Sequence, residues 1–103
     1  MTGHLWKTAA MIEAMAGRPR GSMPQGVNGI SIDSRSLAPG DAFFAIKGDR
    51  VDGHDYANVA VANGAGVLVV SEAKLPALGS IHAPLIVVPD VLDALEKLGR
   101  AAR

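Results

Sequence analysis

Two short runs of apolar residues, at positions 67–70 and 85–88, constrain the fold of this chain more than any other feature. Both runs are continuous and rich in β-branched residues, which is typical of strands that are covered on both faces. Segments with apolar residues at helical spacing can supply that cover, and they span residues 5–16, 56–63 and 91–102. The sequence therefore predicts a three-layer α/β/α sandwich around a small parallel or mixed sheet.

Turn residues place two further strands before the apolar runs. Apolar residues alternate from Val27, which predicts a strand over residues 27–32 that ends in a polar cluster. Pro39-Gly40 fits the two central positions of a type II turn, after which residues 42–46 predict another strand. Residues 17–26 hold three glycines and two prolines and predict a loop. The predicted order is helix, strand, strand, helix, strand, strand, helix.

Capping residues mark the ends of the three predicted helices. The first helical pattern is expected to stop at Gly17, before Pro19. Gly64 is expected to end the second helix as its C-terminal glycine, because glycine accepts the left-handed conformation found there. Asp55 and Asp90 are expected to begin the second and third helices by accepting hydrogen bonds from the first turn.

Length and composition limit the possible classes of function. A chain of 103 residues, 49% of them hydrophobic, is expected to be one globular domain. The absence of cysteine excludes disulfides, thiolate metal sites and cysteine nucleophiles. Ten basic and ten acidic residues argue against a surface for nucleic acid or anionic membranes.

The two ends of the chain carry expectations about its location and extent. The first residues lack the pattern of a signal peptide, and no apolar run approaches the roughly 20 residues that span a bilayer. We therefore expect a cytoplasmic domain without membrane insertion. The last helical pattern runs to the end of the sequence, so we expect the natural polypeptide to continue beyond Arg103.

Polar residues concentrate in two loops, each directly after a predicted strand, at positions 33–35 (Asp-Ser-Arg) and 47–55. Ligand crevices of α/β proteins form at such strand ends. One possible chemistry is nucleophilic catalysis by Ser34 with His54 and an aspartate. No Gly-x-Ser-x-Gly sequence surrounds Ser34, and a turn hydroxyl that bonds its own backbone is the plainer interpretation.

Two other chemistries are open in the same loops. A divalent metal could be held by oxygen and imidazole ligands, for which the candidates are Asp49, Asp52, His54 and Asp55. Their spacing matches no known metal template, and capping of helices and turns is the alternative. A phosphate could be contacted by the cations Lys47, Arg50 and Arg35, whose alternative is solvated surface charge.

The sequence lacks both common nucleotide motifs. It contains no Gly-x-x-x-x-Gly-Lys-Ser/Thr phosphate loop and no dinucleotide fingerprint. The chain by itself is therefore not expected to bind ATP or NAD in the usual ways.

The two loops belong to a longer string that resembles the amino-terminal domain of the Mur ligase family. The string comprises Asp33-Ser-Arg, Pro39-Gly-Asp, Phe44, Gly48, Asp52-Gly-His and, further on, Asn63-Gly-Ala. The resemblance covers nearly the whole chain. Within the family, the sequence Asp-Gly-His-Asp-Tyr and residues 91–103 are most similar to the D-alanyl-D-alanine-adding branch, with the meso-diaminopimelate- or lysine-adding branch as the alternative.

The resemblance implies that residues 1–103 form a single amino-terminal domain that binds a UDP-sugar. The full enzyme would be an ATP-dependent amide ligase of peptidoglycan precursor synthesis, with UDP-N-acetylmuramoyl-tripeptide as substrate. ATP and Mg²⁺ would bind in central and carboxy-terminal domains outside this chain. Residues 1–103 would hold no cofactor, no metal ligand and no catalytic residue of their own. A stand-alone binding module and a small metal-dependent hydrolase that uses Asp49, Asp52 and His54 are the alternatives.

The resemblance also implies which residues touch the substrate. Ile32 and Ser34 would lie against the uracil and its ribose, and three residues of the second loop, Asp49, Arg50 and Val51, would contact the nucleotide. The residues expected to shape the two loops are Asp33, Arg35, Gly48, Asp52, Gly53 and His54.

Overall fold

A computed structural model of the chain describes residues 6–46, 56–78, 81 and 83–101. The strands are β1 (Trp6–Lys7), β2 (Arg18–Arg20), β3 (Gly26–Val27), β4 (Ile30–Ser31), β5 (Ala42–Phe44), β6 (Val67–Ser71) and β7 (Leu85–Val88). The helices are α1 (Thr8–Met15), α2 (Ala57–Ala62), the 3-10 helix η2 (Glu72–Lys74), α3 (Leu75–Leu78) and α4 (Val91–Ala101).

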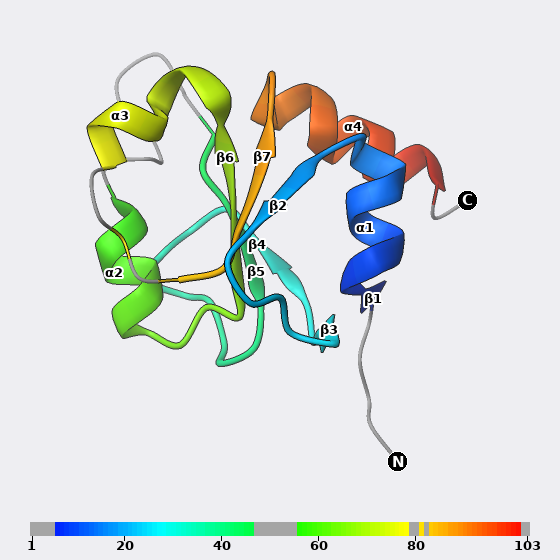
Figure 1. Cartoon of the computed structure of the whole chain (residues 1–103). Helices are drawn as coiled ribbons and strands as arrows, with labels where there is room; N and C mark the ends of the chain where they lie inside the picture. The colour runs from blue at the N-terminus through cyan, green and yellow to red at the C-terminus, as the bar shows by residue number, and fades with distance from the viewer. Residues whose placement is uncertain (1–5, 47–55, 79–80, 82, 102–103) are drawn as a thin grey trace.

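Five of these strands form one mixed sheet at the centre of the molecule (Figure 1). Their order is β2-β7-β6-β5-β4, and β4 to β7 run parallel to one another. β2 is antiparallel to β7 and forms one edge of the sheet. β1 and β3 make a separate antiparallel pair.

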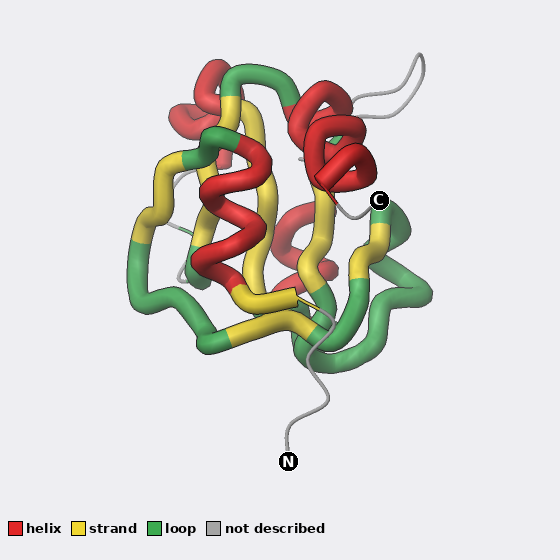
Figure 2. Tube along the Cα trace, turned by 90° about the vertical axis from the view of Figure 1, so that its right-hand side faces the viewer, coloured by secondary structure: helices red, strands yellow, loops and turns green. Residues whose placement is uncertain are grey.

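Helices cover both faces of the sheet, which confirms the predicted three-layer α/β/α fold. α1 and α4 lie in front of one face in Figure 2, and their side chains share a buried cluster with β5, β6 and β7. α2 and α3 cover the other face, where a second cluster contains side chains from the same three strands. The molecule therefore has two cores, one on each side of the sheet.

The alternation of side chains along the strands explains why the apolar runs have no polar side. In β5, Phe44 packs into the cluster with α1 and α4, and Phe43 packs into the cluster with α2. In β6, Val69 and Leu68 divide in the same way, and both are fully buried. Each strand residue therefore removes apolar surface from water on one face or the other.

Most of the predicted element ends agree with the structure. Asp90 precedes α4, and its Oδ1 atom accepts a 3.1 Å hydrogen bond from the backbone N–H of Asp93. Gly64 ends α2 with a φ of +95°. Gly40 has a φ of +89° in a turn closed by the N–H of Asp41, which donates to the Ala38 carbonyl at 3.0 Å. Asp55 lies outside the described residues.

The first helix departs from the prediction at both ends. Residues 6–7 form a strand, so the helix begins at Thr8. At its other end the left-handed position belongs to Ala16, with a φ of 54°, and not to Gly17. Gly17 is needed for space instead, because a Cβ atom there would lie 2.5 Å from Cγ2 of Ile86.

The structure departs from the predicted local structure at four places. The single strand expected over residues 27–32 is interrupted at Asn28, whose N–H donates to the Gly40 carbonyl at 3.0 Å, so β3 and β4 join different sheets. The loop expected over residues 17–26 contains β2, and a helical segment, η2 and α3, fills residues 72–78, where none was predicted. The strand expected over residues 42–46 ends at Phe44.

Candidate functional site

A pocket of about 500 Å³ opens where β4 and β5 end, beside the start of α2. The turn that follows β4 forms one wall, and the other walls come from the end of β5 and from the residue before α2. The lining residues are Ile32, Asp33, Ser34, Arg35, Phe43, Ile46 and Tyr56. The carboxyl ends of parallel strands are the usual place for a ligand in an open α/β sheet.

Local hydrogen bonds shape the turn over residues 33–36. The hydroxyl of Ser31 accepts from the N–H of Asp33 at 3.1 Å and donates to its carbonyl at 2.9 Å. The side-chain Oδ1 atom of Asp33 accepts from the backbone N–H of Arg35 at 2.9 Å, and the backbone carbonyl of Asp33 accepts from the N–H of Ser36 at 3.3 Å. This is the local bonding that Asp and Ser favour in turns, and it leaves Ser34 at the apex, 5% exposed.

Asp33 and Arg35 form an ion pair at the rim of the pocket. The Nε atom of Arg35 lies 3.3 Å from Oδ1 of Asp33, and the Arg35 side chain is 84% exposed. The backbone N–H of Arg35, and then its guanidinium, hold the pKa of the Asp33 carboxyl below its ordinary value of 3.8. The Asp33 carboxylate in turn raises the pKa of Arg35, which stays cationic.

Apolar side chains form the remaining surface of this pocket. Phe43 is buried in the core below it, whereas Ile32 and Tyr56 are 61% and 41% exposed. These two are among the few large hydrophobic side chains that the described part of the chain leaves in water. A flat, partly apolar ligand would cover them, since small-molecule sites combine apolar walls with a few placed polar groups.

The turn is attached to α2 at its apex. The Nδ2 atom of Asn63, at the end of α2, donates a 2.7 Å hydrogen bond to the carbonyl of Ser34.

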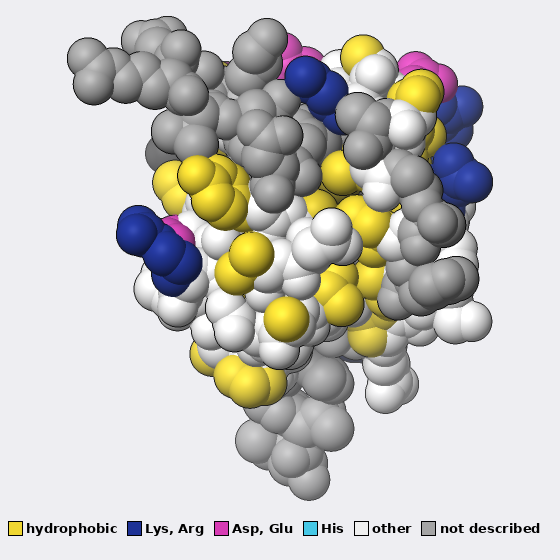
Figure 3. All heavy atoms as spheres, turned by 90° about the vertical axis from the view of Figure 1, so that its left-hand side faces the viewer, with side chains coloured by type: hydrophobic (Ala, Val, Ile, Leu, Met, Phe, Trp, Pro, Cys, Tyr) yellow, Lys and Arg dark blue, Asp and Glu magenta, His cyan; other side chains and the backbone are white. Residues whose placement is uncertain are grey.

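The side of the molecule that carries α2 and α3 is shown in Figure 3, where hydrophobic side chains reach the surface in patches and Lys and Arg stand at the margins of the view.

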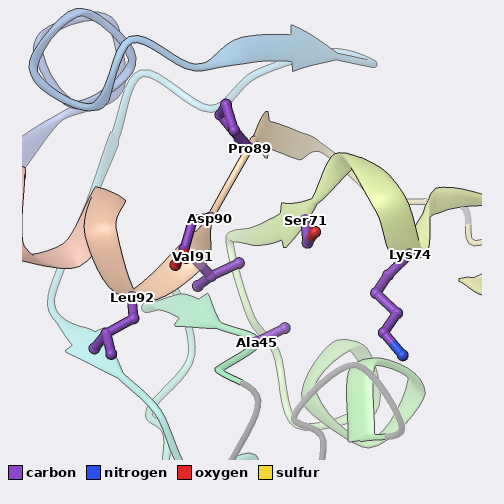
Figure 4. A pocket seen from close by; sticks show the side chains of 7 residues that line it. All are labelled: Ala45, Ser71, Lys74, Pro89, Asp90, Val91 and Leu92. Carbon is purple, nitrogen blue, oxygen red and sulfur yellow. The ribbon is translucent and has the colours of Figure 1, made fainter.

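A second pocket of about 320 Å³ lies farther along the same edge of the sheet, where β5, β6 and β7 end (Figure 4). Ala45, Ser71 and Asp90 contribute to its lining, together with the first residues of α4. Lys74 also borders it, but in Figure 4 its side chain extends away from Ser71 and Asp90.

A third pocket, of about 390 Å³, lies beside the edge strand β2. It is bordered by Arg18, Arg20 and Leu75. Arg18 forms an ion pair with Glu72 across this edge.

The structure brings together the four residues predicted in the first loop. Ile32, Asp33, Ser34 and Arg35 all line the first pocket. The predicted residues of the second loop lie outside the described residues, and these are Lys47, Gly48, Asp49, Arg50, Val51, Asp52, Gly53, His54 and Asp55. The interpretations that depended on them, which are the nucleophile pair, the metal site and the phosphate contacts of Lys47 and Arg50, stay predictions.

Three lining residues were not predicted as part of the site, namely Phe43, Ile46 and Tyr56. Each was assigned to a strand or helix on its apolar periodicity alone. Tyr56 had a further signal, because it directly follows the polar loop and its side chain has both an aromatic face and a hydroxyl.

The described residues lack two other kinds of functional feature. No three His, Asp or Glu side chains among them stand close enough to hold a metal ion. None of the helices in the described ranges is both long enough and apolar enough to span a membrane.

Known proteins share both the sequence and the fold of this chain. A profile of the "Mur ligase family, catalytic domain" matches residues 26–103. A UDP-N-acetylmuramoyl-L-alanyl-D-glutamate--2,6-diaminopimelate ligase of Geobacillus thermodenitrificans is 44% identical over 80% of the chain. The UDP-N-acetylmuramoyl-tripeptide--D-alanyl-D-alanine ligase of Escherichia coli is 38% identical over 75% of it. The chain covers 16% of the length of each of these two ligases.

The structural comparison extends over nearly all of the chain. A crystal structure of MurF from Acinetobacter baumannii superimposes with a TM-score of 0.80 and 32% identity, over 95% of this chain and 21% of that one. With a profile match over most of the sequence and this fold, the chain belongs to the Mur ligase family.

Proposed function

We propose that the chain is the domain of a Mur ligase that binds the UDP end of a UDP-N-acetylmuramoyl-peptide. The observation that carries this proposal is the first pocket, in which exposed apolar side chains stand beside a turn with an arginine at its rim. The names of the related ligases supply the substrate class, since each acts on a UDP-N-acetylmuramoyl compound.

The chemistry of the pocket suits the parts of a uridine nucleotide. Ile32 and Tyr56 offer apolar surface to the faces of a planar base. Turn peptides near Ser34 supply hydrogen-bonding groups close to the base and ribose. The exposed guanidinium of Arg35 supplies positive charge for the diphosphate, because guanidinium groups pair well with phosphate oxygens.

We assign catalysis to other parts of a longer protein. The chain contains no phosphate-loop sequence of the kind that holds ATP, and among its described residues no three His, Asp or Glu side chains stand close enough to hold a metal ion. The full-length enzyme would be an ATP-dependent amide ligase of peptidoglycan precursor synthesis. This chain would bind and orient the substrate, while the central and carboxy-terminal domains activate its carboxylate and supply the amine.

We propose addition of D-alanyl-D-alanine as the reaction of the full-length enzyme. A solved structure named as the UDP-N-acetylmuramoylalanyl-D-glutamyl-2,6-diaminopimelate--D-alanyl-D-alanyl ligase of A. baumannii supports this assignment, since it is 31% identical over 96% of this chain. Addition of diaminopimelate is the second candidate, because the G. thermodenitrificans ligase has the higher sequence identity, 44% against 38% for the E. coli D-alanyl-D-alanine ligase.

An assay of the full-length protein separates these candidates. Purified enzyme is given ATP and Mg²⁺ with either UDP-N-acetylmuramoyl-tripeptide and D-alanyl-D-alanine or UDP-N-acetylmuramoyl-L-alanyl-D-glutamate and diaminopimelate. We expect phosphate release and a ligated product with the first pair. Product with the second pair alone would reassign the reaction, and product with neither would contradict the proposed activity.

A further inference from the structure

The hydrogen bond between Asn63 and Ser34 joins two residues that are 29 positions apart in the sequence. Its length is 2.7 Å from Nδ2 of Asn63 to the carbonyl oxygen of Ser34. A carbonyl only accepts hydrogen bonds, so the amide nitrogen of Asn63 must face it. The bond therefore fixes the position of the peptide that follows Ser34, at the wall of the first pocket.

The end of α2 does not need this side chain. The backbone N–H of Gly64 donates to Val61 and that of Ala65 donates to Ala60, each at 3.0 Å, which together close the helix in a Schellman motif. The N–H of Asn63 itself donates to Val59 at 3.0 Å. The amide of Asn63 is thus free of any capping duty at its own helix.

The helix end is held firmly to the rest of the sheet. The carbonyl of Gly64 accepts from the N–H of Gly40 at 2.8 Å, and the N–H of Gly66 donates to the carbonyl of Asp41 at 2.8 Å. A Cβ atom at Gly64 would lie 3.2 Å from Pro39, so the two segments are in close contact. Asn63 therefore projects from a rigid base.

Within the part of the chain that the structure describes, the turn has no comparable set of hydrogen bonds to other elements. The hydrogen bonds that shape it join Ser31, Asp33, Arg35 and Ser36 to one another, each within three positions along the chain. Among the bonds described for this turn, the one from Asn63 alone reaches another element of the fold. Local hydrogen bonds give the turn its shape, whereas the bond from Asn63 joins it to the end of α2.

We propose that Asn63 is a positioning residue for nucleotide binding. It holds the Ser34 peptide where the turn can meet the ligand, so that binding need not order the turn first. Preorganisation of this kind raises affinity without adding a contact to the ligand. This inference rests on the proposed function, because the ligand it concerns is the uridine diphosphate group.

The test compares variants of the 103-residue chain in titrations with UDP. Asn63→Ala removes the donor, and Asn63→Asp keeps its shape but replaces the donor with a carboxylate that repels the Ser34 carbonyl. Asn58→Ala is the matched control, since Asn58 is exposed on the same helix. We expect the Kd for UDP to rise about 3- to 10-fold in Asn63→Ala, the effect of one net hydrogen bond, and at least as much in Asn63→Asp. Asn58→Ala should leave it unchanged.

A second measurement needs no ligand. In Asn63→Ala, amide hydrogen exchange should quicken at Arg35 and Ser36, while the amides of Gly64 and Ala65 keep their protection because the backbone closes that helix end. Faster exchange throughout α2 would show a merely structural role and overturn the inference. So would Kd values within two-fold of the parent in both Asn63 variants.

The two proposals fail in different ways. A parent chain that does not bind UDP contradicts the proposed function, and the exchange measurement still decides whether Asn63 holds the turn. A parent chain that binds UDP with unchanged affinity in the Asn63 variants contradicts only the role of Asn63.

Discussion

Ala16 occupies at the end of α1 the left-handed position that Gly64 occupies at the end of α2. Both helices close in the same way: the N–H of Gly17 donates to Ile12 at 2.9 Å, and the N–H of Ala65 donates to Ala60 at 3.0 Å. Only one of the two positions carries the residue that this geometry favours. Among the described non-glycine residues, Ala16 is the one with a positive φ.

Replacing Ala16 by glycine should therefore stabilise the protein. An L-residue in the left-handed region costs about 1 kcal/mol, and glycine removes that cost. We expect Ala16→Gly to raise Tm by about 4–8 °C in thermal unfolding followed by circular dichroism. Gly64→Ala is the reverse change and should lower Tm by more, since its Cβ atom would also press on Pro39 at 3.2 Å. An Ala16→Gly variant with lower stability would contradict this interpretation of the α1 end.

Two other glycines make a matched pair for packing. A Cβ atom at Gly17 would lie 2.5 Å from a methyl of Ile86, a β-branched side chain with no exposed surface, whereas one at Gly99 meets nothing within 4 Å. Gly17→Ala should therefore lower the free energy of unfolding by about 1–3 kcal/mol, the usual effect of overpacking a core. Gly99→Ala should raise the free energy of unfolding by up to about 1 kcal/mol through helix propensity. Urea unfolding measures both, and equal effects would contradict the packing described here.

The titration of Asp33 tests the geometry of the turn. Its pKa is lowered first by the backbone N–H of Arg35 and then by the guanidinium. Arg35→Ala keeps the backbone donor, so the pKa of Asp33 should rise only part of the way to 3.8. Carboxyl ¹³C shifts followed against pH measure this. A full return to 3.8 would show that the N–H contact at 2.9 Å does not hold in solution.

The same shift fixes the sign of its effect on stability. A folded-state pKa below the unfolded value means that the carboxylate stabilises the fold above the unfolded pKa. The stabilisation from the Asp33 carboxylate is lost as the pH falls below about 3.8 and through the lowered folded-state pKa. The pair is exposed, so the effect on unfolding is small and diminishes with added salt.

Comparing substitutions of Tyr56 and Val59 tests whether a loss of UDP binding comes from a lost ligand contact or from a less apolar surface. Both are 41% exposed, but only Tyr56 lines the first pocket. Contact between a base and an aromatic ring is worth roughly 1–3 kcal/mol, so Tyr56→Ala should raise the Kd for UDP about ten-fold or more. Val59→Ala should leave it unchanged. Calorimetric titration measures both, and equal losses in the two variants would remove Tyr56 from the proposed site.

The layers of the fold follow from sequence, because they depend on buried apolar periodicity. Strands β6 and β7 and helix α4 agree with their predicted positions, since each has an uninterrupted apolar run or stripe. Strand β2 has no apolar pattern of this kind. Its residues are Arg-Pro-Arg, all exposed, and they form a strand by pairing with the edge of β7, where Arg18 lies opposite Val87, 69 positions later in the chain. Pairing at such a distance leaves no local pattern.

The site divides along similar lines. The polar turn at residues 33–35 could be recognised, because Ser and Asp side chains bond to nearby backbone, as Ser31 and Asp33 do here. Of its apolar walls, only Ile32 was predicted, through the family resemblance; Phe43, Ile46 and Tyr56 were not, since they carry the same apolar pattern as core residues. The contact between Asn63 and Ser34 depends on where α2 ends in space, which no local signal in the sequence gives.

The most direct test of the proposed function is a titration of ¹⁵N-labelled chain with UDP, followed by amide chemical shifts. Binding at the first pocket predicts saturable shifts centred on Ser34, Arg35 and Tyr56, with little change at Ser71 and Asp90 in the second pocket. Absence of saturable shifts, or shifts centred on the second pocket, would contradict the assignment of the uridine diphosphate site to the turn that follows β4.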